Sequence, residues 1–487
     1  MLKRPLVLAL WAAAAAANAG ELQDDLRARR ERVMARLGSD AMFVQFSAPL
    51  KTYSLDVEYE YRQDSDLLYL TGIDQEDTIL VLMPGNQTKR EFLFVSDADP
   101  RREHRQGHLL TTEEAAQQSG IATVYPRSAY AGFVRSIFNS RAFRARAGEV
   151  DTEYDRFFEA LKQGQARLWL LFGPKPGPED PLPPVYEFAQ KARDRYPTVS
   201  IVDATDVVHG LRQVKTPYER KLLAQSVLIS SEAHLAGMRT ARPGRHEYEV
   251  ESAIEAVYLA NGASSWGYPS IVGSGPNATI LHYSKSARRM EAGDLLLVDA
   301  AASYQGLTGD ITRSYPVSGT FSEPQRDVYR IVLAAQEAGM RAAVAGGFTL
   351  DVERAAAAVV REGLLKLGLI SDAKGDQYRT WYTHGICHWI GMDVHDVGDY
   401  RRPLEPGMAF VVEPGIYVRQ DFLDNLPQTP ENKAFVEKVR PAVEKYKGIG
   451  IRIEDSFLLT EQGLARLSAK VPRTLEEVEG FLRSRPR

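Results

Sequence analysis

The sequence predicts an α+β protein of two domains: an N-terminal α/β domain with one mixed sheet, then a larger C-terminal domain. Three observations lead to this fold class. The length of 487 residues allows two or three domains. Helical and strand-like stretches alternate up to about residue 203. Beyond residue 215, helices come in pairs and are interleaved with strands that carry the polar residues.

The composition excludes some classes of protein. Hydrophobic residues make up 44% and charged residues 25% of the chain, as in ordinary globular proteins. The formal net charge is −4 and no stripe of Lys and Arg stands out, so we expect no nucleic-acid partner. Cys387 is the only cysteine, so no intrachain disulfide can form. A thiolate role for Cys387, between two histidines, is an alternative that its many carboxylate neighbours disfavour.

The first nineteen residues have the pattern of a signal peptide. Lys3 and Arg4 form a basic start, residues 6–17 are apolar, and Ala17-Asn18-Ala19 is a small-residue cleavage site. This apolar run is too short to span a bilayer, and no other stretch is apolar enough. We therefore expect export, cleavage near Ala19, and a periplasmic or secreted protein without a membrane span. A retained anchor or an apolar tail is the alternative.

The N-terminal domain is expected over residues 20–207, after the signal peptide at 1–19. Residues 21–37 predict a charged helix and residues 41–46 (AMFVQF) a strand. The turn Pro84-Gly85-Asn86 between apolar runs indicates a hairpin. The other expected strands of this domain are residues 168–172 and 199–202.

The C-terminal domain, residues 208–487, is expected to begin with a long helix. Thr216 and Glu219 form a capping box around Pro217, which suits the first helical position. A second helix is expected over 246–261, a third from the cap Ser322 to 344, and a fourth from the cap Thr349 to 367. The expected strands between them are residues 270–273, 280–283 and 294–301.

Four carboxylates in this domain lie in or beside apolar runs, where an unpaired charge is costly. They are Asp299, Asp310, Glu413 and Glu454. Divalent cations would neutralise them, and oxygen ligands with one histidine suit Mn²⁺, Co²⁺ or Zn²⁺. Because there are more such ligands than one ion usually needs, we expect a site for two metal ions that generates a bridging hydroxide.

Each residue of this pattern, taken alone, is weak evidence for a metal site. Asp299 and Asp310 could be solvated aspartates at strand ends, joined by a hairpin at Gly306. His384 and His388 have helical zinc-protease spacing, but glycine follows His384 where that motif has glutamate. Glu413 and Glu454 could be structural residues paired with an arginine such as Arg452. His395, flanked by two aspartates, favours a shared polar cavity.

The ordered set is specific. D-x10-D, H-G-x-x-H, V-E-P-G and G-I-R-I-E-D together resemble the aminopeptidase P and prolidase family of metallopeptidases, with its pita-bread fold. The resemblance covers residues 212–479 and extends weakly to Y-R-Q-D-S-D at 61–66. It implies two divalent ions, usually Mn²⁺, on five ligands: Asp299, Asp310, His388, Glu413 and Glu454. It also implies that His282, His384 and His395 line the substrate pocket. In addition, we expect Arg452 to orient a ligand carboxylate.

The resemblance implies hydrolysis of the N-terminal Xaa-Pro bond of proline-containing peptides by a metal-bridging hydroxide, with Glu413 passing the proton to the leaving nitrogen. It also implies a homo-oligomer. A prolidase acting on Xaa-Pro dipeptides is the first alternative, and a peptide-binding relative without activity is a remoter one. A metal-free amidinohydrolase like creatinase fits poorly because that branch lacks the full ligand set. Methionine aminopeptidases generally lack this N-terminal domain.

Overall fold

The computed structural model describes residues 4–144, 151–173 and 175–485, and for residues 4–19 only the helical backbone. The chain divides into two compact units, Met1–Arg212 and Gln213–Arg487. Helix α8 (Thr205–Arg212) lies across the boundary expected at residue 207 and belongs to the first unit. Among the described residues, no helix has both the length and the apolar character needed to cross a membrane.

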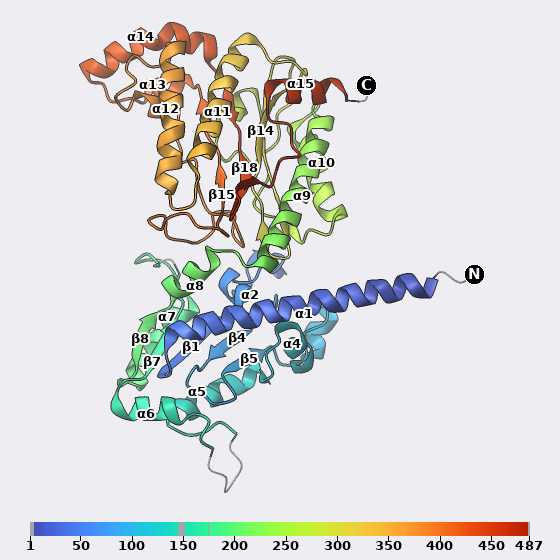
Figure 1. Cartoon of the computed structure of the whole chain (residues 1–487), viewed down its shortest axis with the longest axis vertical. Coiled ribbons are helices and arrows are strands. Elements are labelled where there is room, and N and C mark those ends of the chain that lie inside the picture. The colour runs from blue at the N-terminus through green and yellow to red at the C-terminus, as the bar shows by residue number, and fades with distance from the viewer. Residues whose placement is uncertain (1–3, 145–150, 174, 486–487) are drawn as a thin grey trace. The chain divides into compact units, whose positions relative to one another are not determined.

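The first unit is built on a mixed sheet, whose described strands run in the order β6-β5-β4-β1-β7-β8 (Figure 1). β1 pairs antiparallel with β4 and parallel with β7, and β4 pairs antiparallel with β5. The remaining pairs, β5 with β6 and β7 with β8, are parallel. The predicted mixed sheet and its hairpin are therefore confirmed. The strands are β1 (Ala41–Phe46), β4 (Ile79–Leu82), β5 (Glu91–Val95), β6 (Val124–Pro126), β7 (Arg167–Leu170) and β8 (Ser200–Asp203).

Helices cover this sheet because their apolar faces need burial. Phe133 and Ile137 of α5 and Phe157 of α6 join the core formed by the central strands. A separate small hairpin, β2 (Thr52–Ser54) with β3 (Val57–Glu58), is exposed. The helices are α1 (Arg4–Leu37), α2 (Ser65–Thr71), α3 (Pro100–Gln106), α4 (Thr112–Ser119), α5 (Tyr130–Phe138), α6 (Asp155–Gln163) and α7 (Pro184–Arg195).

The expected signal peptide lies at the start of α1. Residues 1–3, which include Lys3 of the basic start, are outside the described residues. Residues 4–19 form the first half of α1, and the helix continues through Ala19 to Leu37. The expected helix over residues 21–37 is the second half of the same element.

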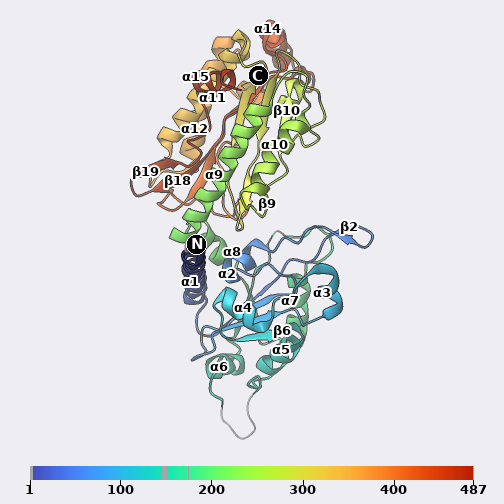
Figure 2. The same cartoon turned by 90° about the vertical axis from the view of Figure 1, so that its right-hand side faces the viewer.

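The second unit contains two helix pairs that flank its strands (Figures 1 and 2). α9 (Pro217–Thr240) begins with the predicted capping box, in which Thr216 and Glu219 each bond the backbone of the other. It pairs with α10 (Glu247–Ala260). α11 (Glu323–Ala342) begins at the predicted cap Ser322 and pairs with α12 (Thr349–Leu367). Thr349 is the first residue of α12, and Phe348 occupies the cap, so that predicted cap was wrong by one position.

Short antiparallel strands lie between the helix pairs. β10 (Ile271–Ser274), β11 (Leu295–Asp299) and β14 (Thr312–Pro316) form one sheet. The predicted hairpin at Gly306 is formed by β12 (Ala302–Tyr304) and β13 (Leu307–Thr308), and Gly306 has a φ of +80° in its turn. The expected strand at residues 280–283 was wrong: the chain there makes a turn after the 3₁₀ helix η2 (Gly275–Thr279).

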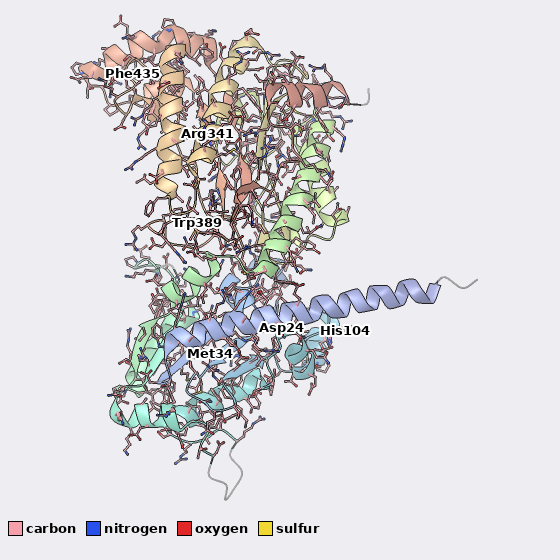
Figure 3. All side chains as sticks on the ribbon, in the orientation of Figure 1. Asp24, Met34, His104, Arg341, Trp389 and Phe435 are labelled. Carbon is pink, nitrogen blue, oxygen red and sulfur yellow. The ribbon has the colours of Figure 1, made fainter. Side chains whose placement is uncertain are left out.

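The remaining strands belong to two further sheets of the second unit. β15 (Ala409–Val412) pairs with β18 (Asp455–Thr460), which pairs with β19 (Gly463–Arg466). β16 (Gly415–Tyr417) pairs with β17 (Gly450–Arg452). One continuous core includes the fully buried Trp389 and the mostly buried Phe435, both labelled in Figure 3. The other elements are β9 (Ser265–Trp266), η3 (Gln377–Thr380), α13 (Gln420–Asp424), α14 (Pro430–Tyr446) and α15 (Leu475–Arg483).

Candidate metal centre

Four of the five candidate metal ligands meet around one ring nitrogen. Nε2 of His388 lies 3.4 Å from Oε1 of Glu413, 3.5 Å from Oδ2 of Asp310 and 3.8 Å from Oε1 of Glu454. One ligand atom each of Asp310, His388 and Glu454 lie within 4.8 Å of one another. These side chains come from segments that are up to 144 residues apart in the sequence, so the fold, and no local motif, creates the cluster.

Strand pairing explains why the acidic residues converge. In the β11–β14 pair, Asp299 at the end of β11 lies opposite Thr312, two residues after Asp310. Thr312 in turn forms a bridge with Glu454, which lies between β17 and β18. The backbone N–H of Glu413, just after β15, donates to the carbonyl oxygen of Ile386 in the histidine segment. Ladder hydrogen bonds thus set the positions of the ligand side chains.

Asp299 is connected to this cluster through two buried polar groups. The hydroxyl of Tyr268 lies 2.6 Å from Oδ1 of Asp299 and also contacts the carboxylate of Asp310. Nη2 of Arg452 donates to Oδ2 of Asp299 at 2.5 Å. Burial alone would raise the pKa of Asp299, but Arg452 and Tyr268 together lower that pKa below its ordinary value. Asp299 is therefore held as a carboxylate beside Asp310.

Arg452 also joins the histidines to the carboxylates. Its Nε donates to Oγ1 of Thr312 at 3.1 Å, and Thr312 donates to Oε2 of Glu454 at 2.6 Å. Its Nη1 donates to the hydroxyl of Tyr417 at 2.8 Å, and that hydroxyl lies 2.8 Å from Nε2 of His384. Arg452 therefore orients Asp299 directly and Glu454 through Thr312.

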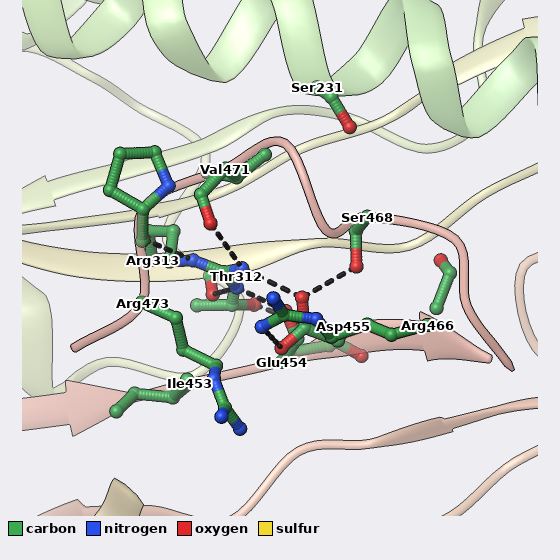
Figure 4. A network of polar contacts seen from close by, with 12 residues as sticks. Ser231, Thr312, Arg313, Ile453, Glu454, Asp455, Arg466, Ser468, Val471 and Arg473 are labelled. Carbon is green, nitrogen blue, oxygen red and sulfur yellow. Dashed lines mark hydrogen bonds and ion pairs between the residues drawn. The ribbon is translucent and has the colours of Figure 1, made fainter. Parts of the chain in front are cut away.

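Behind Glu454 lies a second network, centred on the fully buried pair Arg313 and Asp455 (Figure 4). Nη2 of Arg313 donates to Oδ1 of Asp455 at 2.7 Å. The other N–H groups of Arg313 donate to backbone carbonyls of Thr312, Glu454, Val471 and Pro472, at 2.5–3.2 Å. Asp455 also accepts from Ser468 and Gln336. This network fixes the backbone that carries Glu454.

The acidic side chains fit a divalent cation. Burial, together with the charge of Asp299, raises the pKa of Asp310 well above its ordinary value. Burial raises the pKa values of Glu413 and Glu454 as well, with each neighbouring carboxylate adding to the effect. Oε1 of Glu454 is buried and has no hydrogen-bond partner among the described residues. A cation between these oxygens would satisfy that atom and offset the mutual repulsion.

The histidines are held neutral, which is the form that binds metals. Burial lowers the pKa of His388 to about 4, and that of His384 also to about 4. Burial also lowers the pKa of His395, whose ring centroid lies 4.4 Å from that of His388. His282 is exposed, and its electrostatic interaction with His384 and with His395 helps to lower the pKa of each of them.

Cys387 does not have the environment of a reactive thiol. Burial raises the pKa of its thiol well above the ordinary value, and the carboxylates of Glu413 and Glu353 raise it further. The side chain packs against the hydrophobic core. The structure therefore disfavours the thiolate alternative.

The structure brings together all nine residues singled out from the sequence, and it adds others that the sequence did not indicate. The nine are Asp299, Asp310, His388, Glu413, Glu454, His282, His384, His395 and Arg452. Tyr268 and Tyr417 were missed, although both bond site residues. Tyr268 directly precedes a proline and Tyr417 ends an apolar strand, so neither stands out in the local sequence.

Two family models match the chain. The model described as metallopeptidase family M24 matches residues 221–461. The model described as aminopeptidase P, N-terminal domain, matches residues 26–144. Every candidate site residue lies within the first match.

Individual proteins match over nearly the whole chain. The Xaa-Pro aminopeptidase of Haemophilus influenzae is 33% identical, with 94% of this chain and 97% of that protein covered. The structure of Pseudomonas aeruginosa aminopeptidase PepP matches with a TM-score of 0.79 at 30% identity, covering 95% of this chain and 98% of that one. The human Xaa-Pro dipeptidase is 34% identical, but over only 56% of this chain and 60% of its own length.

Proposed function

Because this chain belongs to metallopeptidase family M24 and is a metallo-aminopeptidase with Xaa-Pro aminopeptidases among its relatives, we propose that it hydrolyses the N-terminal Xaa-Pro bond of peptides at a centre of two metal ions. The observation that carries this proposal is the convergence of Asp310, Glu413 and Glu454 within 3.8 Å of one nitrogen of His388. Asp299 joins them through Tyr268, which completes a donor set suited to two cations.

In this proposal, Asp299, Asp310, His388, Glu413 and Glu454 would hold two divalent ions, with Mn²⁺ as the native metal and Co²⁺ or Zn²⁺ as substitutes. Bound ions of this kind supply a hydroxide nucleophile at neutral pH and polarise a carbonyl group. The chain's part is to fix the ligands. Arg452 does so for Asp299, and Thr312 for Glu454, through charge-assisted hydrogen bonds.

The remaining residues act on the peptide. Glu413, whose pKa is raised by burial and by Glu454, is suited to carry a proton and pass it to the leaving nitrogen. His395 and His282 are exposed at the site, where they can donate hydrogen bonds to the substrate or to the oxyanion that develops on its carbonyl group. His384 is held by the hydroxyl of Tyr417 and would orient the scissile peptide.

The shape of an Xaa-Pro bond suits a dedicated site. Proline has no backbone N–H, and its ring fixes the local backbone angle φ. Peptidases that bind an extended chain through that N–H therefore lose a contact. A site whose histidines hydrogen-bond the carbonyl group of the substrate would not need that contact.

Prolidase activity is the second candidate, and the comparison with the human Xaa-Pro dipeptidase supports it over about half of the chain. The match to Xaa-Pro aminopeptidases favours aminopeptidase activity, because this match extends through the N-terminal domain. A peptide-binding relative without activity is the remoter candidate. The complete set of nine site residues favours catalysis over that reading.

The proposal extends to the rest of the chain. Residues 208–487 would form the catalytic domain and residues 20–207 the N-terminal domain, after removal of residues 1–19 during export to the periplasm or the medium. The active protein would be a homo-oligomer that takes proline-containing peptides as substrates.

A cleavage profile tests the proposal. The purified protein is incubated with Xaa-Pro dipeptides and with longer Xaa-Pro peptides, after treatment with a chelator and after addition of Mn²⁺, Co²⁺ or Zn²⁺. Release of the first residue from the longer peptides, lost on chelation and restored by a metal, is the expected result. Cleavage of dipeptides alone would identify a prolidase. No cleavage of any substrate with any metal, and no bound ion by elemental analysis, would favour a binding protein.

A further inference from the structure

A fully buried ion pair lies beside the site without belonging to it. Nζ of Lys215 donates to Oδ2 of Asp396 at 2.7 Å, and each side chain is only 1% exposed. The two residues are 181 positions apart. Lys215 lies just before α9, and Asp396 directly follows His395, so the pair connects the start of the second unit to the histidine segment.

Backbone contacts fix the main chain at Lys215. Its N–H donates to the carbonyl oxygen of Gly407 at 2.8 Å, and Val214 forms a bridge with Met408. The next residue, Thr216, caps α9. The backbone of Lys215 is therefore fixed on both sides, and burial with Asp396 fixes its ammonium group.

The ammonium group of Lys215 lies inside the loop from His388 to Asp396. A Cβ atom on Gly391 would clash with both Nζ of Lys215 and the carboxylate of Asp396, so the loop backbone lies directly against the pair. The N–H of Asp396 donates to the carbonyl oxygen of Trp389 at 2.8 Å and closes the loop. On the outer side, the carbonyl oxygen of Gly391 accepts from Thr308, two residues before Asp310.

This closed loop sets the position of His395 against the candidate metal ligand His388. The two imidazole rings are 4.4 Å apart between centroids and inclined at 85°. His395 is exposed, whereas Asp396 is buried. The buried pair therefore holds the end of the loop directly beside His395, whose ring contacts that of His388.

We propose that Lys215 and Asp396 are positioning residues, whose ion pair fixes His395 beside His388 for the reaction. The inference rests on the proposed function for its kinetic part. A purely structural role explains the pair less well, because a buried ion pair often contributes no more stability than apolar residues of the same size. What a fixed pair of charges does contribute is a defined geometry for the loop that it closes.

Removing both charges separates the two roles. The double variant Lys215→Met with Asp396→Leu leaves no buried charge behind, so its melting temperature should exceed those of the single variants Lys215→Met and Asp396→Asn and approach that of the wild type. We expect kcat of the double variant to stay about ten- to a hundredfold below the wild type, with KM changed much less, because a small displacement of His395 weakens contacts made in the transition state.

The matched control is Arg326→Met with Glu479→Leu, which removes a mostly buried ion pair between α11 and α15, outside the site. This control should keep the kcat of the wild type. If the Lys215 and Asp396 double variant regains stability and also has wild-type kcat, the positioning role is refuted.

A second variant covers the case in which the double variant does not fold. Asp396→Glu keeps both charges but moves the carboxylate by one methylene group, so a positioning role predicts a lower kcat and a structural role a nearly unchanged one. A crystal structure of the metal-free Asp396→Glu protein should show the rings of His388 and His395 displaced from their 4.4 Å separation. An unchanged separation refutes the inference even if no peptide proves to be a substrate, whereas failure of the wild type to cleave Xaa-Pro peptides counts against the proposed function alone.

Discussion

The hydroxyl group of Tyr268 lies 2.6 Å from Oδ1 of Asp299, although Tyr268 precedes Asp299 by 31 positions in the sequence. The same hydroxyl contacts Asp310, so one hydroxyl group bridges two candidate ligands. Burial and the two carboxylates raise the pKa of Tyr268 well above its ordinary value, which keeps the phenol protonated. Tyr268 therefore acts as a fixed donor that holds the two carboxylates side by side.

Tyr268→Phe should weaken metal binding. Without the hydroxyl, Asp299 and Asp310 lose a shared partner, and loss of a support of this kind typically lowers metal affinity about 10- to 100-fold. The measurement is metal-dependent activity against free metal concentration, with calorimetric titration of the metal-free protein. Tyr446→Phe is the control, because Tyr446 also donates to a carboxylate, that of Asp327, but outside the site. Equal metal affinities for both variants would contradict this role.

Asp310→Asn should stabilise the metal-free protein while abolishing activity. Because the pKa of Asp310 is raised by burial and by Asp299, keeping it ionised at neutral pH costs free energy in the folded state. The amide removes that cost, and each 1 kcal/mol gained should raise the melting temperature by about 2–4 °C. Thermal unfolding in a chelator measures this, and added metal should stabilise the wild type far more than the variant. A lower melting temperature for the metal-free variant would show that no repulsion was relieved.

Arg313→Met should be among the most destabilising substitutions in the second unit. It removes the closest cationic partner of the buried Asp455 and the hydrogen bonds from Arg313 to four backbone carbonyls. Breaking a buried pair from one side costs about 3–5 kcal/mol. Chemical denaturation measures the free energy of unfolding, and Arg313→Lys should recover only part of the loss because lysine lacks the planar fork. A loss of less than about 1 kcal/mol in the free energy of unfolding of Arg313→Met would refute a stabilising role for the network drawn in Figure 4.

The buried, neutral His234 should make the free energy of unfolding of the protein fall in mild acid. Burial lowers the pKa of His234 to about 4 from an ordinary value of 6.5, while its Nε2 lies 2.9 Å from the carbonyl oxygen of Ala300. Below pH 6.5 the unfolded chain takes up a proton that the folded chain does not, so stability falls as the pH falls towards 4, by about 2 kcal/mol at pH 5.

The variant His234→Gln tests this dependence, because its side-chain amide can still donate to Ala300 but does not titrate. Urea denaturation at pH 7 and pH 5 should show a smaller loss for the variant than for the wild type. The same loss in both proteins would assign the acid sensitivity to other groups.

Local signals were enough to predict several elements. Thr216, Pro217 and Glu219 mark the start of α9 because capping is a property of a few consecutive residues. The candidate ligands Asp299, Asp310, Glu413 and Glu454 could be singled out because a carboxylate within an apolar run needs compensation wherever it is. Both kinds of argument need no knowledge of the partner.

Other features depend on partners distant in the sequence. Residues 280–283 resemble a strand in their composition. However, the buried carboxylate of Glu247 accepts from Ser274, Tyr283 and the backbone of Arg288, and it holds this segment in another conformation. The residues next to Lys215 in the sequence do not show whether its side chain faces solvent or pairs with Asp396. The partner lies 181 positions away and is brought to Lys215 only by the fold, so the sequence could not identify the role of Lys215.

The carbonyl groups of Val471 and Pro472 that accept from Arg313 are synthesised after every candidate ligand. The first unit, which ends at Arg212, contains none of these ligands or carbonyl groups, so the acidic centre and its support come from the part of the chain that is made late. Assembly of the acidic centre is thus a late event in biosynthesis. A stop codon just upstream of Val471 would remove its support even though Asp299 and Glu454 had already been translated.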